Sequence, residues 1–317
     1  ALPILAMIEN LTDPIFHNEE AARAHLEAIR WPDGPNCPHC GNADGDTIHA
    51  LNGKSHRPGL FQCNACREHF TVTVGTVMER SHIPLHKWVL AFHLMNASKK
   101  GVSAHQLHRM LAITYKSAWF MAHRVREAMA IEPTGPMGGE GSTVQADETY
   151  YGNTSKRAKH YKKGHSHKSG VVALVEPQTG KVRAVAMQKA NVETVREFLV
   201  TNVDRKSELH TDESALYTKT GREFAAHKTV NHGWNGRGYY VGKDGQTTNN
   251  VENFFGVFKK GMVGVYHFCG EQHLQRYLNE FSFRYSNRSG LGVSDGERAA
   301  LAIKGAEGKR LTYRQAH

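Results

Sequence analysis

The spacing of hydrophobic positions changes several times along this chain and divides it into segments of different predicted structure. Apolar residues recur at helical spacing over 18–31, where Pro32 ends the pattern, and again in about three pieces over 86–129. The segment 132–140 is rich in proline and glycine and has the composition of a linker. Beyond it, short apolar runs alternate with helical patterns as far as about Arg288. We therefore expect a largely helical first half and an α/β second half.

The second half has an order of elements that indicates one topology. The predicted strands are 144–149, 171–175, 182–187, 207–212 and 228–231. The predicted helices are 192–203, 216–224 and 246–260. Three strands, a helix, a strand, a helix, a strand and a helix follow one another in the ribonuclease-H-like order. We therefore predict an α/β protein in which a ribonuclease-H-like domain follows the helical part.

The first half contains a pair of predicted helices joined by a short turn, with Ser103 and Thr114 as their caps. This pattern is typical of a helix-turn-helix, whose second helix meets DNA, but an ordinary helical hairpin in a core has the same pattern. On the second helix, three basic positions lie off the apolar face and would contact phosphates. They are Lys116, Arg124 and Arg126.

Composition narrows the class of protein only modestly. The 317 residues suggest two or three domains, and 39 % hydrophobic residues are enough for a sizeable core. A formal net charge of +10 favours a polyanionic partner, although a merely basic soluble protein has the same balance. No run approaches the roughly 18–20 apolar residues that span a bilayer, and the opening 1–7 is a poor signal peptide. We expect a cytoplasmic protein with no membrane partner.

Cysteines give the sharpest metal signal. Cys37 with Cys40, and Cys63 with Cys66, form two C-x-x-C pairs. Two thiolates at this spacing reach one ion, and two such pairs complete a tetrahedral site with no open position. The spacing therefore predicts a zinc ribbon holding one structural Zn²⁺ per chain, rather than a catalytic metal or a secreted disulfide framework.

Three acidic residues stand where a two-metal nuclease needs them. Asp147 lies on a predicted strand, Asp212 ends a later strand, and Glu252 lies on the last predicted helix. Mg²⁺ ions take carboxylate ligands and keep positions for water and phosphate, so acids that converge at one sheet edge can hold two ions. Glu148 and Glu213 neighbour the two aspartates, and we expect them to have no ligand role.

Basic residues accompany these acids. Lys259 stands two helical turns after Glu252 and on nearly the same face of the predicted helix. A basic, histidine-bearing insertion follows Asp147 and would grip the DNA backbone, although a solvated charged loop has the same composition. The further basic residues that we expect to contact DNA are Lys156, Arg157, Lys162, Lys163 and Lys260.

Taken together, these motifs resemble one known family, the zinc-ribbon, DDE-type insertion-sequence transposases of bacteria, of the ISXO-like group. The resemblance covers about residues 31–288. Besides the four cysteines, it rests on Asp-Glu-Thr-Tyr-Tyr-Gly over 147–152, Thr-Asn-Asn-Val-Glu over 248–252 and Phe-Lys-Lys-Gly-Met-Val-Gly-Val-Tyr-His over 258–267. Spacing alone predicts a zinc ribbon and a metal-dependent nuclease, and the resemblance adds transposition.

The resemblance implies a transposase that binds the terminal inverted repeats of its element and target DNA, and that cleaves and joins strands. Asp147, Asp212 and Glu252 would bind two catalytic Mg²⁺ or Mn²⁺ ions, with Lys259 as the accompanying basic residue. A homodimer or higher synaptic oligomer, associated with the nucleoid, is expected. The alternatives are a ribonuclease-H-like nuclease or resolvase without strand transfer, and a non-catalytic DNA-binding regulator derived from a transposase.

The predicted organisation has five parts. They are an N-terminal helical segment (1–31), the zinc ribbon (32–82), a helical DNA-binding segment (83–131), the catalytic domain (141–290) and a C-terminal tail (291–317). The tail is polar, and we expect it to be loosely held.

Overall fold

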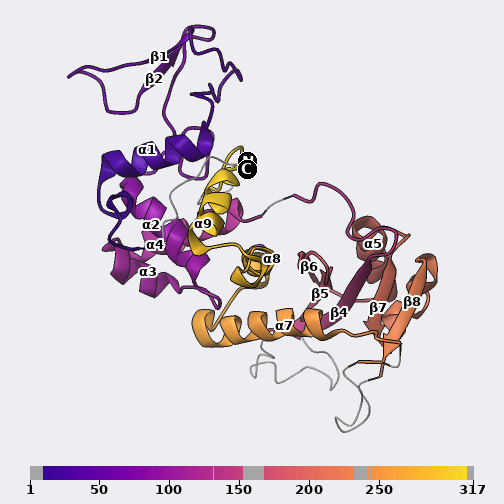
Figure 1. Ribbon diagram of the computed structural model, residues 1–317. Helices are drawn as coiled ribbons and strands as arrows, with labels where there is room; N and C mark the ends of the chain where they lie inside the picture. The colour runs from indigo at the N-terminus through magenta and orange to yellow at the C-terminus, as the bar shows by residue number, and fades with distance from the viewer. Residues whose placement is uncertain (1–9, 131, 153–167, 232–240, 243, 313–317) are drawn as a thin grey trace. The chain divides into compact units, whose positions relative to one another are not determined.

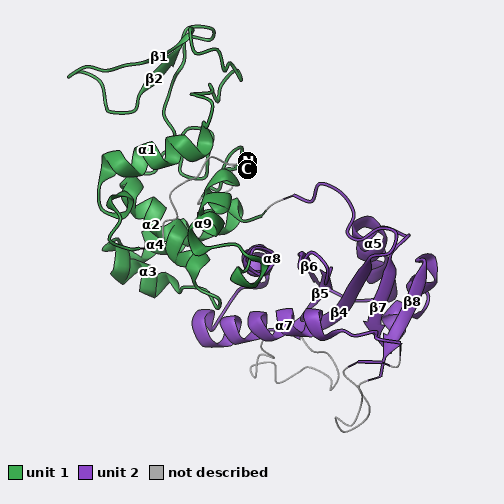
Figure 2. Ribbon diagram, viewed as in Figure 1, with its two compact units in different colours: residues 1–131, 288–317 green, residues 132–287 purple. Residues whose placement is uncertain are grey.

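The computed structural model (Figure 1) describes residues 10–130, 132–152, 168–231, 241–242 and 244–312. Its internal contacts divide the chain into two compact units, which Figure 2 colours separately. Unit 1 consists of residues 1–131 and 288–317, and unit 2 of residues 132–287. In the part of the chain that the structure describes, no helix combines the length and the apolar character needed to cross a membrane.

Unit 1 joins a small sheet to a group of helices. The three-stranded sheet is antiparallel, in the order β1 (Ile48–Ala50), β2 (Phe61–Cys63) and β3 (His69–Phe70). The helices are α1 (Glu19–Arg30), α2 (Leu85–Ala97), α3 (Ala104–Leu111), α4 (Tyr115–Ala128) and α9 (Asp295–Lys304), with 3-10 turns at Pro14–Phe16 and Ser289–Leu291.

Side-chain caps mark where α1, α3 and α4 of unit 1 begin. The Asn18 side chain accepts hydrogen bonds from the first turn of α1. The hydroxyls of Ser103 and Thr114 cap α3 and α4, as the sequence predicts. Between these two helices Ala112 takes the left-handed conformation, with φ of 47°, which ends α3 and starts the turn.

The prediction of a loosely held tail over 291–317 is wrong for residues 295–304, because these residues form α9. A capping box of Ser294 and Glu297 begins this helix, and α9 packs against α2 within unit 1. Arg298 is only 5 % exposed and donates a 2.7 Å hydrogen bond to the backbone carbonyl of Asn96, at the end of α2. The apolar residues of this short helix are interspersed with charged residues, so the composition of the segment indicated a polar tail.

Unit 2 is a five-stranded sheet in the order β6-β5-β4-β7-β8. Its strands are β4 (Thr143–Tyr151), β5 (Ser169–Val175), β6 (Val182–Met187), β7 (Glu208–Asp212) and β8 (Ala226–Val230). The pairs β4–β5 and β5–β6 are antiparallel, whereas β4–β7 and β7–β8 are parallel. This order and these directions confirm the predicted ribonuclease-H-like fold, with β4 in the middle of the sheet.

The helices of unit 2 lie against the two faces of this sheet (Figure 1). They are α5 (Val192–Asn202), α6 (Ala215–Thr218), α7 (Asn249–Gly261) and α8 (Leu274–Ser286), with 3-10 turns at Thr220–Glu223 and Glu271–His273 and a π-helical turn at Met262–Tyr266. The helix expected over 216–224 is thus a short helix followed by a 3-10 turn. The expected linker 132–140 contributes Met137 to the core of unit 2, where it is 3 % exposed.

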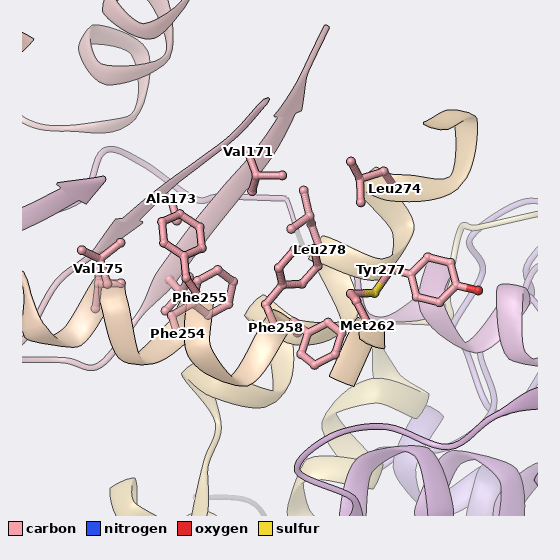
Figure 3. Close-up of a cluster of buried hydrophobic side chains, with 13 residues drawn as sticks. Val171, Ala173, Val175, Phe254, Phe255, Phe258, Met262, Leu274, Tyr277 and Leu278 are labelled. Carbon is pink, nitrogen blue, oxygen red and sulfur yellow. The ribbon is translucent and has the colours of Figure 1, made fainter. Parts of the chain in front are cut away.

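Strand β5 connects the two cores of unit 2, because successive side chains of a strand point to opposite faces. Val172 and Leu174 face a cluster that includes α5. Val171, Ala173 and Val175 face the other cluster, in which α7 and α8 contribute most of the side chains (Figure 3). Of the α7 side chains in this cluster, Figure 3 labels Phe254, Phe255 and Phe258. This apolar contact fixes α7 across the sheet face that carries the acids described next.

Candidate active site

Two neighbouring parallel strands bring Asp147 and Asp212 together. The register of β4 and β7 ends with Gln145 beside His210, and each aspartate stands two residues further on. Because side chains alternate along a strand, both aspartates share the α7 face with the residues two positions before them. One carboxylate oxygen from each of Asp147, Glu148 and Asp212 lies within 4.8 Å of the others. The sheet therefore gathers three acids at one place.

The burial of Asp147 has an electrostatic consequence. Burial, together with the negative charges of Asp212, Glu148 and Glu252, raises the pKa of Asp147 to about 7. A hydrogen bond from the backbone N–H of Glu148, 2.8 Å long, opposes this rise. Carboxylates crowded in this way repel one another, and a divalent cation among them removes the repulsion. The donor set thus fits a hard cation.

Glu148, for which we expect no ligand role, lies in the acidic cluster with Asp147 and Asp212. Its carboxylate accepts a hydrogen bond from the Tyr217 hydroxyl at 2.6 Å and another from the Ser214 hydroxyl at 3.4 Å. Burial raises the pKa of Glu148, while the bond from Tyr217 lowers it. Strand alternation sets Glu148 on the opposite face from Asp147, but the long side chain reaches the same cluster. The sequence alone does not predict this position of Glu148, because Tyr217 and Ser214 are more than sixty residues away from it along the chain.

Glu252 lies near the three acids without joining the group whose oxygens fall within 4.8 Å. It is in the first turn of α7, and its negative charge contributes to the raised pKa of Asp147. One of its carboxylate oxygens accepts a 2.5 Å hydrogen bond from the buried hydroxyl of Thr248. The structure therefore brings the third predicted acid to the same face as Asp147, with a hydrogen bond from the N-cap residue of its helix.

The predicted basic residues are placed unequally. Lys259 and Lys260 are exposed in the last turn of α7, and Lys116 is exposed on α4. Arg124 is half-buried and donates to the backbone carbonyl of Glu79 at 3.2 Å. Arg126 is only 2 % exposed, which contradicts its predicted access to phosphate. The reason is that α4 buries side chains around much of its circumference rather than along one stripe. The predicted contacts Lys156, Arg157, Lys162 and Lys163 lie outside the described residues.

The four cysteines of unit 1 converge as predicted. Their sulfur atoms all lie within 4.8 Å of one another. Cys37 Sγ lies 3.7 Å from Cys66 Sγ, and Cys40 Sγ lies 3.8 Å from Cys63 Sγ. These separations exceed a disulfide bond of about 2 Å but match the edge of a tetrahedron with metal–sulfur bonds of about 2.3 Å, roughly 3.8 Å. The geometry is that of a four-thiolate metal site.

The thiols of this cluster do not titrate alike. A hydrogen bond from the Cys66 backbone, helped by the Asn42 side chain, lowers the pKa of Cys63 to about 6. The Glu68 backbone lowers the pKa of Cys66, but burial and the neighbouring sulfurs outweigh that bond and raise it to about 12. Without a cation the cluster resists full ionisation, and a cation that binds all four thiolates removes this resistance.

Comparisons with known proteins agree with this geometry. A family of transposase zinc-ribbon domains matches residues 17–69, and the family described as ISXO2-like transposase domain matches residues 138–286. A protein of Halobacterium salinarum, named as an uncharacterized protein in transposable element ISH50, is 24 % identical over 288 residues. That match covers 85 % of this chain and 91 % of the relative.

Solved structures with some likeness include the integrase catalytic core domain of HTLV-2 in complex with magnesium, in a trimeric and a dimeric form. They are 18 % and 15 % identical, with TM-scores of 0.28 and 0.27, and cover 48 % and 45 % of this chain and 86 % of each integrase chain. At such values the likeness carries no argument, and the fold assignment rests on strand order and the family matches. Residues 138–286 are thus an ISXO2-like transposase domain that contains the acids, and residues 17–69 are a transposase zinc ribbon that contains the four cysteines.

Proposed function

We propose that this protein binds the ends of an insertion sequence and catalyses metal-dependent DNA strand cleavage and strand transfer. The observation that carries the proposal is the convergence of Asp147 and Asp212 on adjacent strands, with Glu252 on the helix packed over them. The family supports a transposase or integrase type of activity. Strand transfer and recognition of the element's ends go beyond that family match and are our proposal.

The acids would hold two Mg²⁺ or Mn²⁺ ions, with Asp147 and Asp212 at the centre and Glu252 and Glu148 on either side. When bound, such ions activate the attacking hydroxyl and stabilise the leaving oxygen in phosphoryl transfer. The protein supplies the fixed placement of these carboxylates. The sheet positions Asp147 and Asp212. A hydrogen bond from Thr248 orients Glu252, and one from Tyr217 orients Glu148. Lys259 and Lys260, both exposed on α7, would contact the phosphates of the strand that enters.

In unit 1 the four cysteines would hold one Zn²⁺ with a structural role, since four protein thiolates leave no position open for a substrate. This unit, with the exposed Lys116 of α4, would bind the terminal inverted repeats. Arg124 and Arg126 are not part of this proposal, because the first already bonds a backbone carbonyl and the second is buried. Two ends must meet for transposition, so we propose a homodimer or higher oligomer acting on DNA at the nucleoid.

A joining assay tests the proposal against its alternatives. The substrate is a labelled duplex that carries the DNA flanking the gene, mixed with an unlabelled target plasmid, protein and Mg²⁺. A transposase transfers the labelled end into the plasmid. A nuclease or resolvase cuts the duplex without that transfer, and a regulator binds the duplex and leaves it intact. Cleavage or binding without transferred label would contradict the proposal.

A further inference from the structure

Helix α7 begins without a side-chain cap from its own N-cap residue, whereas α5 of the same unit has a capping box. Its N-cap residue is Thr248, whose side chain makes no capping hydrogen bond. The Thr248 hydroxyl instead donates to the Glu252 carboxylate. The first N–H groups of a helix need acceptors, above all in a buried setting, and Thr248 is 1 % exposed. The Thr247 hydroxyl accepts from the N–H of Asn249 at 3.1 Å, so another residue must supply the acceptor for the N–H groups that follow.

That residue is Gln145 of β4. Its side-chain oxygen Oε1 accepts a 3.0 Å hydrogen bond from the N–H of Asn250 and a 3.3 Å bond from the N–H of Val251. Gln145 is 1 % exposed, so water does not compete for this oxygen. A residue of the central strand thus caps a helix more than a hundred positions later in the chain.

His210 makes a parallel contact from β7. Its Nδ1 accepts a 3.3 Å hydrogen bond from the N–H of Thr247, two residues before the first residue of α7. Its Nε2 lies 2.6 Å from a carboxylate oxygen of Glu208, which fixes the ring. His210 is 6 % exposed and stands beside Gln145 in the register of the two strands. The two side chains therefore lie next to each other on the face that α7 covers.

Gln145 and His210 lie close to the acids along their own strands. Gln145 and His210 each precede an aspartate of the cluster, Asp147 and Asp212, by two residues on the same face of the same strand. They hold the backbone of residues 247–251, which leads directly into Glu252. The strands that place two acids thus also hold the start of the helix that carries the third.

We propose that Gln145 and His210 are positioning residues of the active site, which act through Glu252 by fixing the first turn of α7 to β4 and β7. The inference rests on the proposed function, because it takes Glu252 as a ligand of the catalytic metal. Residues that orient metal ligands typically affect metal affinity or activity by about 10–100-fold. The alternative is that the pair only satisfies buried backbone groups and contributes stability alone.

Mn²⁺ affinity, measured on the full chain from the electron paramagnetic resonance signal of the free ion, separates these readings. Gln145→Leu removes the acceptor at similar size, and Gln145→Glu keeps an oxygen there. Gln275→Leu is the matched control: Gln275 also ties a helix to a strand of this sheet, accepting from the N–H of Ala186 and donating to the carbonyl of Ala184, but on β6. Each variant is made with Glu252 and with Glu252→Gln.

We expect Gln145→Leu to weaken Mn²⁺ binding about 10–100-fold when Glu252 is present. When Glu252 is replaced by Gln, the same change should weaken binding less than about twofold, because Gln145 acts only through the Glu252 carboxylate. Gln145→Glu should restore most of the affinity, and Gln275→Leu should leave it unchanged. Wild-type affinity in Gln145→Leu, or the same loss in both backgrounds, would overturn the inference.

Two further results keep the outcomes distinct. Glu252→Gln with unchanged affinity removes Glu252 as a ligand and overturns both the inference and that part of the proposed function. Loss in Glu252→Gln without loss in Gln145→Leu overturns the inference alone. Should Gln145→Leu not fold, His210→Phe deletes the companion acceptor, and it should lower the affinity only in the presence of Glu252. An equal loss in both backgrounds would make His210 a purely structural residue.

Discussion

The hydroxyl of Tyr217 donates a 2.6 Å hydrogen bond to the carboxylate of Glu148. Tyr217 is fully buried in the core on the α5 face of the sheet, so its hydroxyl is a fixed donor. A second hydroxyl, that of Ser214, lies 3.4 Å from the other oxygen of the same carboxylate. Glu148 is thus directed before any ion binds, which is how a residue prepared for a metal differs from an acid on the surface.

Glu148→Gln should therefore weaken Mn²⁺ binding about tenfold or more, because it removes a charged oxygen from the cluster. Glu213→Gln is the matched control, since Glu213 neighbours Asp212 and accepts a hydrogen bond from the Asn231 side chain instead. Titration of Mn²⁺ into both variants gives the answer. Equal Mn²⁺ affinity of Glu148→Gln and wild type would show that Glu148 does not bind the metal.

The raised pKa of Asp147 makes a prediction about pH. Because this pKa is about 7 in the fold against an ordinary 3.8, the folded state keeps a proton that the unfolded state releases between these values. Stability from this group is therefore lost as pH rises through that window. Without added Mg²⁺, Asp147→Asn should melt like wild type at pH 4 and higher than wild type at pH 8, by about 2–4 °C per kcal/mol relieved.

Calorimetry of the unit 2 transition at both pH values measures this difference. Added Mg²⁺ should raise the melting temperature of wild type at pH 8 and leave Asp147→Asn almost unchanged, since binding to the folded state alone stabilises it. A variant that melts below wild type at pH 8 without metal would show that the buried carboxylate is not a source of repulsion.

The cysteine cluster predicts one zinc per purified chain. Cys37→Ser should lose that zinc and unfold the ribbon, because a structural zinc contributes about 10–16 kcal/mol of apparent binding energy. Unit 2 should keep its own melting transition. Cys269→Ser is the control: Cys269 packs beside the α7 and α8 cluster and should leave the zinc in place. Elemental analysis and hydrogen exchange over 37–70 give the readout, and full zinc content in Cys37→Ser would contradict the site.

The C-terminal helix predicts a second effect on unit 1. Arg298 donates to the carbonyls of Asn96 and Val293 and pairs with Asp295 at 2.7 Å. Arg298→Leu leaves these buried acceptors without their donor, and each such loss costs about 1–3 kcal/mol. We expect a lower melting temperature for unit 1 only. An unchanged transition would mean that α9 contributes little to that unit.

The sequence predicted those features whose cause is local. Caps at Ser103 and Thr114 and the two cysteine pairs each depend on neighbours within a few residues. The apolar run over 171–175 likewise predicted a strand, which lies within β5. The order of strands and helices then fixed the fold, because few topologies fit that order.

What the sequence did not predict depends on distant partners. Glu148 acquires its place from Tyr217, and Gln145 becomes a helix cap only when α7 lies across β4. Arg126 is buried although its helical position indicated exposure. Helix α9 was missed because its apolar stripe is short and its partner, α2, lies about two hundred residues earlier. Such contacts follow from the fold and leave no local pattern.

The most direct test of the catalytic account is strand transfer by Asp212→Asn. This change keeps the shape of the side chain and removes one charged oxygen from the cluster that Asp147 shares. The assay supplies a duplex with a pre-cut end, a target plasmid and Mg²⁺, and compares this variant with wild type and with Glu213→Gln. Ligands of a shared metal set act as a unit, so we expect Asp212→Asn to bind the end but give less than about one-thousandth of the joined product. Joining by Asp212→Asn at the rate of wild type would contradict the account.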